Sequence, residues 1–120
     1  MRKVEKASLE EYLREGILDN EDRERGIAVV NVLSEELFHA GHIPGSMNVP
    51  FNDKAVSCFK EKFNRDKWIV LYSKSGDCNE ASRCAGELIA AGFTAIQIYS
   101  GGMLEWSESP AIIERGTGDA

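Results

Sequence analysis

The sequence predicts an α/β domain in which helices cover a central, mainly parallel β-sheet. Two short runs, residues 27–33 and 68–72, are rich in β-branched and aromatic residues and almost continuously apolar, as in strands buried on both faces. Stretches with apolar residues three and four positions apart lie between and after these runs, as in amphipathic helices. Strands that alternate with helices favour right-handed crossovers and a parallel sheet.

The first predicted element is a helix that begins at Ser8. Ser8 is a good N-cap residue, Glu11 three positions later completes a capping box, and Gly16 is a suitable stop. Residues 19–25 are almost all charged, so we expect a solvated loop there. The apolar run 27–33 then predicts the first strand.

A short helix, a turn and a short strand are expected next. Residues 34–40 have helical character, residues 41–46 are rich in turn formers, and residues 47–49 read as a short strand. Residues 51–63 carry apolar side chains at helical spacing, with Cys58 beside the apolar face.

A polar connection at residues 64–67 leads into the central strand, residues 68–72. The helix that follows begins at Asn79, and Gly92 is a good residue for the position after its end. One side of this helix is expected to be apolar and to face the core: Ala81, Cys84, Ala85, Leu88 and Ile89.

The last part of the chain predicts one more strand and a short helix. Residues 94–99 read as the strand, residues 101–102 as a glycine turn, and residues 103–106 as the helix. We find no internal repeat and no domain boundary, so residues 1–120 are expected to form one domain, with about 114–120 as a flexible tail.

Composition and charge exclude several classes of protein. A net charge of −6 disfavours nucleic-acid binding and an anionic membrane surface, and no apolar run is long enough to span a bilayer. The N-terminus lacks the apolar segment of a signal peptide, so a cytoplasmic location is expected. Three cysteines without a Cys-x-x-Cys pair predict neither a disulfide framework nor a zinc site. We expect no metal, no cofactor, and a monomer or weak dimer.

The stretch from Trp68 to Cys78 organises the rest of the chain. A strand ends there in a short polar loop, and a helix follows the loop. Backbone N–H groups converge at such a helix start, and the helix dipole favours negative charge, so the loop is a natural anion site. Two of its residues carry nucleophilic atoms, Ser73 and Cys78.

Three segments resemble the motifs of single-domain rhodanese-like proteins, and the resemblance covers nearly the whole chain. Residues 41–50 (GHIPGSMNVP) resemble the family's G-H-I-P-G-A-x-N-[IV]-P signature, residues 70–76 (VLYSKSG) its strand and active-site loop, and residues 101–106 (GGMLEW) its late G-G-x-x-x-W motif. The resemblance implies a small α/β domain, which agrees with the periodicity.

The resemblance also implies sulfur transfer. A loop cysteine of the family takes a sulfane sulfur from a small anion such as thiosulfate, or from a persulfide, and passes it to a thiol acceptor or cyanide. On this basis the catalytic positions are Ser73, at the family's nucleophile position, and Cys78, as a resolving or alternative thiol. The expected substrate-binding residues complete the same loop: Lys74, Ser75, Gly76, Asp77 and Asn79.

Ser73 departs from the family, which has cysteine at this position. A serine hydroxyl is barely ionised without an adjacent base and cannot form a persulfide. Ser73 is therefore either an engineered replacement of cysteine or the native residue of a non-catalytic, rhodanese-like binding or regulatory module. Cys78 lies five positions later, near the helix start, where a thiolate is favoured. It is either a chemical group or an unreactive thiol.

Other residues near the motifs have structural or neutral interpretations. The family often has Asp-Val-Arg where this chain has Asn31-Val32-Leu33, so two charges are missing beside the site. His42 is expected to make a structural hydrogen bond, and Cys84 to be a small core residue. Related phosphatases need a cysteine at the start of the loop and an arginine at its end, whereas the next arginine here is Arg83, inside the helix.

Overall fold

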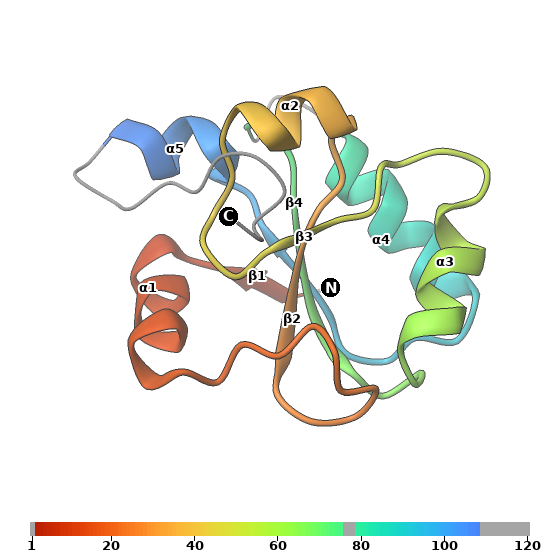
Figure 1. Ribbon diagram of the computed structural model, residues 1–120. Helices are drawn as coiled ribbons and strands as arrows, with labels where there is room; N and C mark the ends of the chain where they lie inside the picture. The colour runs from red at the N-terminus through yellow and green to blue at the C-terminus, as the bar shows by residue number, and fades with distance from the viewer. Residues whose placement is uncertain (1, 76–78, 109–120) are drawn as a thin grey trace.

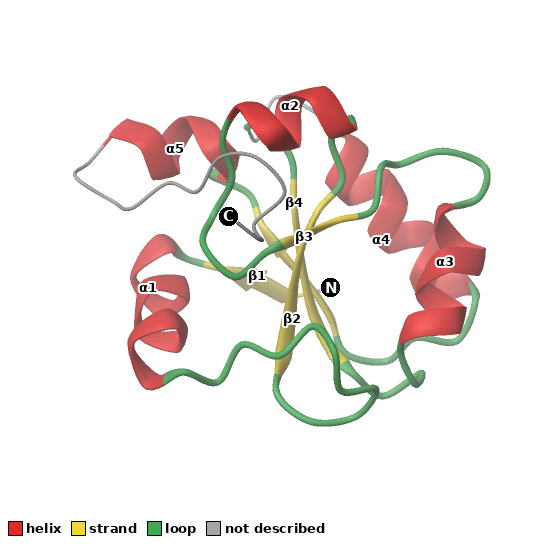
Figure 2. Ribbon diagram, in the orientation of Figure 1, coloured by secondary structure: helices red, strands yellow, loops and turns green. Residues whose placement is uncertain are grey.

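In the computed structural model, which describes residues 2–75 and 79–108, five parallel strands form one sheet in the order β1-β5-β4-β2-β3. The strands are Arg2–Val4 (β1), Ile27–Asn31 (β2), Met47–Asn48 (β3), Trp68–Tyr72 (β4) and Ile96–Tyr99 (β5). Figure 2 shows the strands crossing the centre of the molecule, with helices on both sides. The predicted α/β fold with a parallel sheet is confirmed.

Two layers of helices cover the sheet (Figure 1). The helices are Lys6–Glu15 (α1), Glu35–Ala40 (α2), Ala55–Lys62 (α3), Glu80–Ala90 (α4) and Gly102–Glu108 (α5). One apolar core lies between the sheet and α3 with α4, and the other lies between the sheet and α1 with α5. Every residue of β2 is buried, as its apolar pattern, broken only by Asn31, predicts for a central strand.

The N-terminal strand β1 was not predicted. It has three residues, and its Arg2 and Lys3 are charged, so the local pattern carries no strand signal. The strand forms because the chain pairs with β5 far away in sequence, from Arg2 opposite Gln97 to Val4 opposite Tyr99. Charged residues are common on such edge strands because they discourage further pairing.

Two predicted helix starts are wrong. Helix α1 begins two residues before Ser8, its N-cap is Glu5, and no side chain caps it, so the capping box does not form. Helix α3 begins at Ala55 instead of residue 51, because Asn52 accepts a hydrogen bond from the Lys54 N–H in a turn before it. Gly16 ends α1 as predicted, with φ of 68°.

The charged loop at residues 19–25 is fixed by a buried lysine. Its side chains are mostly exposed, as expected, but the Lys67 ammonium donates to the carbonyl oxygens of Asp19 and Asp22, each at 2.8 Å, and also to that of Arg25. Lys67 itself is fully buried, so the prediction of a merely polar connection at residues 64–67 missed its role.

Helix α4 packs largely as predicted, with Ala81, Cys84, Ala85 and Leu88 buried. Ile89 is the exception, because it is exposed at the end of the helix. No helix in the part of the chain that the structure describes is long and apolar enough to cross a membrane. The predicted tail at residues 114–120 lies outside the described residues.

Candidate functional site

Ser73 lies at the carboxyl end of β4, where the chain leaves the sheet and turns toward α4. Ser73 is only 3% exposed, whereas Lys74 is exposed and Ser75 is half-buried. Asn79 is exposed at the N-cap of α4 and makes no side-chain cap. The structure thus brings these four predicted site residues to one end of the sheet, while Gly76, Asp77 and Cys78 lie outside the described residues.

Helix α5 holds the start of this loop through its backbone. The N–H of Met103 donates to the Ser73 carbonyl oxygen at 3.1 Å, and the N–H of Leu104 donates to the Lys74 carbonyl oxygen at 2.8 Å. The two N–H groups belong to the first turn of α5, where they have no partner within the helix. The late glycine motif therefore acts on the loop, a connection that the sequence interpretation did not make.

Gly102 allows this close approach. Its φ is 64°, and a Cβ atom added there would lie 2.5 Å from the Ser73 carbonyl oxygen and 2.7 Å from that of Lys74. No side chain fits such a distance, and a positive φ favours glycine in any case. Gly102 is thus a positioning residue for the loop, and its signal in the sequence was the Gly101-Gly102 pair.

The Gly-His-Ile-Pro-Gly-Ser turn is attached to β4 just before Ser73. The N–H of Ile43 donates to the Tyr72 hydroxyl oxygen at 3.1 Å, and the hydroxyls of Tyr72 and Ser46 share a hydrogen bond of 2.8 Å. His42 is buried, its Nδ1 donates to the Phe38 carbonyl oxygen at 2.8 Å, and its ring stacks on Phe38. The predicted structural hydrogen bond of His42 is confirmed.

Neutral groups occupy the adjacent end of β2. The Asn31 side-chain oxygen accepts from the Leu33 N–H at 2.8 Å, while its buried Nδ2 has no hydrogen-bond partner in the described part of the chain. Leu33 is buried as well. The Asn48 amide donates to the carbonyl oxygens of Asn31 and Leu33, at 3.0 and 2.8 Å, and so joins the ends of β2 and β3.

The Ser73 hydroxyl has no hydrogen bond within the described residues, so no described side chain acts as a base for it. Such a hydroxyl is a poor nucleophile near neutral pH. Arg83 lies inside α4 with its guanidinium 5.4 Å from the centre of the Phe51 ring, consistent with its predicted place in the helix. The described residues contain no cluster of three potential metal ligands.

The two cysteines that the structure describes differ in environment. Cys84 is fully buried in the core beneath α4, and burial raises the pKa of its thiol to about 12, with a further contribution from the negative charge of Glu87. Cys58 is half-buried and packs against the same core. The expectations that Cys84 is a core residue and that Cys58 lies beside the apolar face of its helix are both confirmed.

Comparisons with known proteins agree with this architecture. The family model of the rhodanese-like domain matches residues 10–109. A thiosulfate sulfurtransferase, GlpE of Pseudomonas savastanoi pv. phaseolicola, is 29% identical over 84 residues, which make up 70% of this chain and 76% of that protein.

Two solved structures share the fold. The BH2092 protein of Bacillus halodurans has a TM-score of 0.77 at 23% identity, with 97% of this chain and 77% of that chain covered. The human single-domain sulfurtransferase TSTD1 has a TM-score of 0.71 at 21% identity, with 92% of this chain and 99% of that chain covered.

Proposed function

The chain belongs to the rhodanese-like domain family, and from this premise we propose that residues 73–79 are a sulfur-transfer loop with serine at the nucleophile position. The observation that carries the proposal is the place of Ser73. It follows β4 directly, at the carboxyl end of a parallel sheet, where ligands of such sheets bind. Its carbonyl oxygen is held by α5, so the loop starts from a fixed point.

The proposed ligand is a small sulfur-containing anion such as thiosulfate, or a persulfide. The first turn of α4 leaves backbone N–H groups without partners inside the helix, and these groups together with the helix dipole favour a negative charge. The exposed Lys74 adds a cation at the loop. Ser75, Gly76, Asp77 and Asn79 complete the proposed binding residues, and the acceptor is a thiol. The proposal treats residues 1–120 as one cytoplasmic domain, a monomer or weak dimer without a cofactor.

Sulfur transfer at this loop needs a thiolate. A thiolate attacks the outer sulfur of thiosulfate, the S–S bond breaks, and sulfite leaves with the electron pair. The enzyme then holds a persulfide, whose outer sulfur is attacked by an acceptor thiolate while the enzyme thiolate is released. Ser73 cannot form this persulfide, so the chain as written depends on Cys78 for any such step, and Ser73→Cys supplies the family's nucleophile.

A second candidate function is a non-catalytic binding module of the same fold. The absence of a described base beside Ser73 favours it, as do the neutral Asn31 and Leu33 at the end of β2. In this case serine is native, and the loop binds an anion or a partner without chemistry. The two candidates differ in whether Cys78 becomes a persulfide and whether cysteine at position 73 restores turnover.

The test measures thiocyanate formed from thiosulfate and cyanide, together with the mass of each cysteine-containing peptide after thiosulfate treatment. Ser73→Cys should give turnover at least 100-fold above Ser73→Ala, in line with the loss expected when a nucleophile is removed. One added sulfur atom on Cys78 in the unaltered sequence would identify it as a carrier, and Cys78→Ser is the control. A folded Ser73→Cys protein that is inactive with thiosulfate and with persulfide donors would refute the sulfur-transfer proposal.

A further inference from the structure

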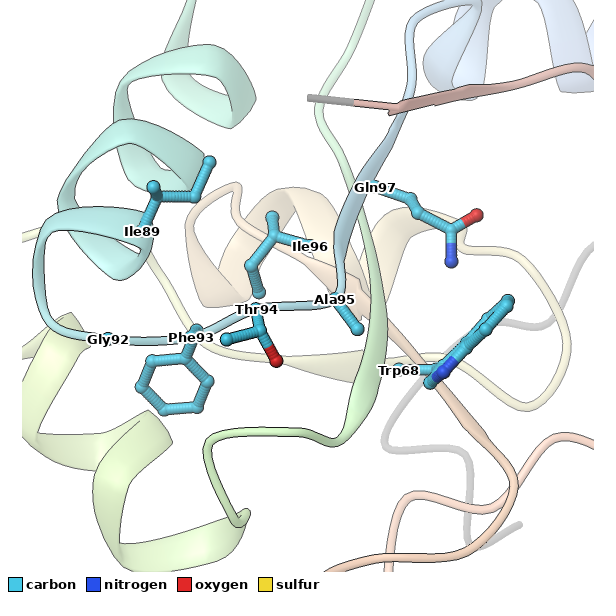
Figure 3. A pocket seen from close by; sticks show the side chains of 8 residues that line it. All are labelled: Trp68, Ile89, Gly92, Phe93, Thr94, Ala95, Ile96 and Gln97. Carbon is cyan, nitrogen blue, oxygen red and sulfur yellow. The ribbon is translucent and has the colours of Figure 1, made fainter.

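A cavity of about 640 Å³ lies at the opposite end of β4 from Ser73. The start of β4, the end of α4 and the connection from α4 into β5 line it (Figure 3). The proposed sulfur-transfer loop leaves the carboxyl end of β4, so this cavity has no part in that function. The size is within the usual range of small-molecule sites.

Gln97 places a buried polar group in this cavity. Gln97 is 3% exposed and lies in β5. In the sheet it is opposite Val70 of β4 on one side and Arg2 of β1 on the other. The carboxamide, however, makes no hydrogen bond within the described residues, although it lines the cavity. Among the described residues, Asn31 Nδ2 is the buried side-chain atom that lacks a partner, so the Gln97 amide atoms stay open to the cavity. The oxygen and the N–H groups of this amide are therefore available to a ligand that enters the cavity.

Trp68 provides an exposed aromatic face next to this amide. It is 45% exposed, whereas Trp106 is only 2% exposed. Figure 3 shows the indole of Trp68 and the carboxamide of Gln97 on the same side of β5, with Ile89 and Phe93 on the other. An indole that stays exposed beside an unpartnered amide offers stacking and hydrogen bonding to the same flat group.

The described lining contains no charged side chain. Ile89, Phe93 and Ile96 are apolar, and the Thr94 hydroxyl already donates to the Arg65 carbonyl oxygen at 3.3 Å. The side-chain polarity offered to a ligand is therefore that of Gln97, with one acceptor oxygen and two N–H donors, and of the Trp68 indole N–H. Such a lining disfavours phosphate and carboxylate groups, because a buried charge needs a partner.

We propose that this cavity binds a neutral, planar heteroaromatic ring that carries a hydrogen-bond donor next to an acceptor, as on the edge of a nucleobase. The ring stacks on Trp68, and its edge pairs with the Gln97 carboxamide. Glutamine makes the same bidentate pairing with adenine, through N6–H and N7. Stacking of bases on aromatic side chains supplies the remaining contact.

The test uses adenine and purine as matched probes, because purine lacks only the exocyclic amino group. Each is titrated into ¹⁵N-labelled full-length protein, and the indole N–H signals of Trp68 and Trp106 are followed by NMR. Adenine should shift the Trp68 signal and the Gln97 side-chain signals in a saturable way and leave Trp106 unchanged. Purine should bind about tenfold more weakly, the loss expected for one hydrogen bond.

Variants separate the amide from the indole. Gln97→Met keeps the length of the side chain and its burial, so it should fold and bind adenine about tenfold more weakly, no better than purine. Trp68→Leu should lose the stacking contact and weaken both probes, whereas Leu104→Ala, at an exposed position on α5, should change nothing.

Three results would overturn the proposal. The first is the absence of a saturable shift of the Trp68 signal with adenine. The second is equal affinity for adenine and purine, which would show that the amide does not read the ring edge. The third is a Trp68 signal that shifts on dilution without any ligand, which would make this face a contact between two copies of the chain.

Discussion

The carbonyl oxygen of Ser73 lies so close to Gly102 that a Cβ atom at position 102 would be 2.5 Å from it. Glycine is therefore required where the first turn of α5 meets the loop. The contact is made by backbone atoms on both sides, so neither side can yield by a change of side-chain rotamer. Through this contact, the first turn of α5 fixes the position of Ser73, which is nearly thirty positions earlier in sequence.

Gly102→Ala should consequently destabilise the protein and displace the loop. The alanine Cβ meets the backbone oxygens of Ser73 and Lys74 and must also adopt a φ of 64°, so we expect a loss of about 2–4 kcal/mol in the free energy of unfolding. Urea unfolding measures this loss. In a Ser73→Cys background, Gly102→Ala should also lower sulfur transfer under conditions where the protein remains folded.

Gly86→Ala is the matched control for that substitution. Gly86 is an exposed residue inside α4, and nothing lies within 4 Å of an added Cβ. Alanine is favoured over glycine in a helix, so this variant should be more stable by about 0.5–1 kcal/mol. Equal effects of the two substitutions would mean that the close approach at Gly102 does not constrain the chain.

Local patterns predicted most of the fold but not the contacts that position the site. Strand β4 is apolar throughout and β2 is apolar except for Asn31, so both could be recognised from sequence. The buried face of α4 could be recognised as well. Strand β1 could not be recognised, since its pairing with β5 is a long-range property. The role of Lys67 could not be recognised either, because its ammonium donates to three carbonyl oxygens of a loop that is distant in sequence. The role of Gly102 likewise depends on a long-range contact, its close approach to Ser73.

Tyr72→Phe should weaken the attachment of the Gly-His-Ile-Pro-Gly-Ser turn to β4. The substitution removes the hydroxyl that accepts from the buried Ile43 N–H and contacts Ser46. A buried N–H without a partner costs about 1–3 kcal/mol, and thermal or urea unfolding should show a loss of this size.

Tyr12→Phe serves as its control. Tyr12 is a half-buried residue of α1, and its hydroxyl makes no hydrogen bond to the part of the chain that the structure describes. Removal of that hydroxyl should change stability by less than about 0.5 kcal/mol. A loss as large as that of Tyr72→Phe would show that the effect comes from tyrosine hydroxyls in general and not from the contact with Ile43.

Cys84 should be inert in the folded protein. Its pKa is raised from 9.0 to about 12 by burial, so at pH 8 its thiolate fraction is about 1000-fold lower than that of an unperturbed thiol. Iodoacetamide followed by peptide mass spectrometry should label the half-buried Cys58 before Cys84, and Cys84 only after urea unfolding. Labelling of Cys84 at the rate of Cys58 under native conditions would contradict its burial in the core beneath α4.

The acidic loop before β2 should make stability depend on pH in the acid range. Backbone N–H groups of Arg25 and Glu24 donate to the Asp22 carboxylate and hold its pKa below 3.8, and Asp19 has a lowered pKa for the same kind of reason. A carboxyl with a lower pKa in the folded state binds fewer protons there than in the unfolded state. Its stabilising contribution is thus fully present above pH 3.8 and is lost as the pH falls through the folded pKa.

Asp22→Asn tests this linkage because it keeps an acceptor oxygen for the turn and removes the charge. The free energy of unfolding, measured by urea titration from pH 7 downward, should fall less steeply below pH 4 in the variant than in the parent chain. At pH 7 the variant should be the less stable of the two, and below the folded pKa of Asp22 the difference should vanish.

Asp53→Asn is the control, since Asp53 is exposed and makes no hydrogen bond to the described residues, and it should leave the slope unchanged. Parallel pH profiles for Asp22→Asn and the parent would show that the carboxylate at position 22 does not contribute through its charge.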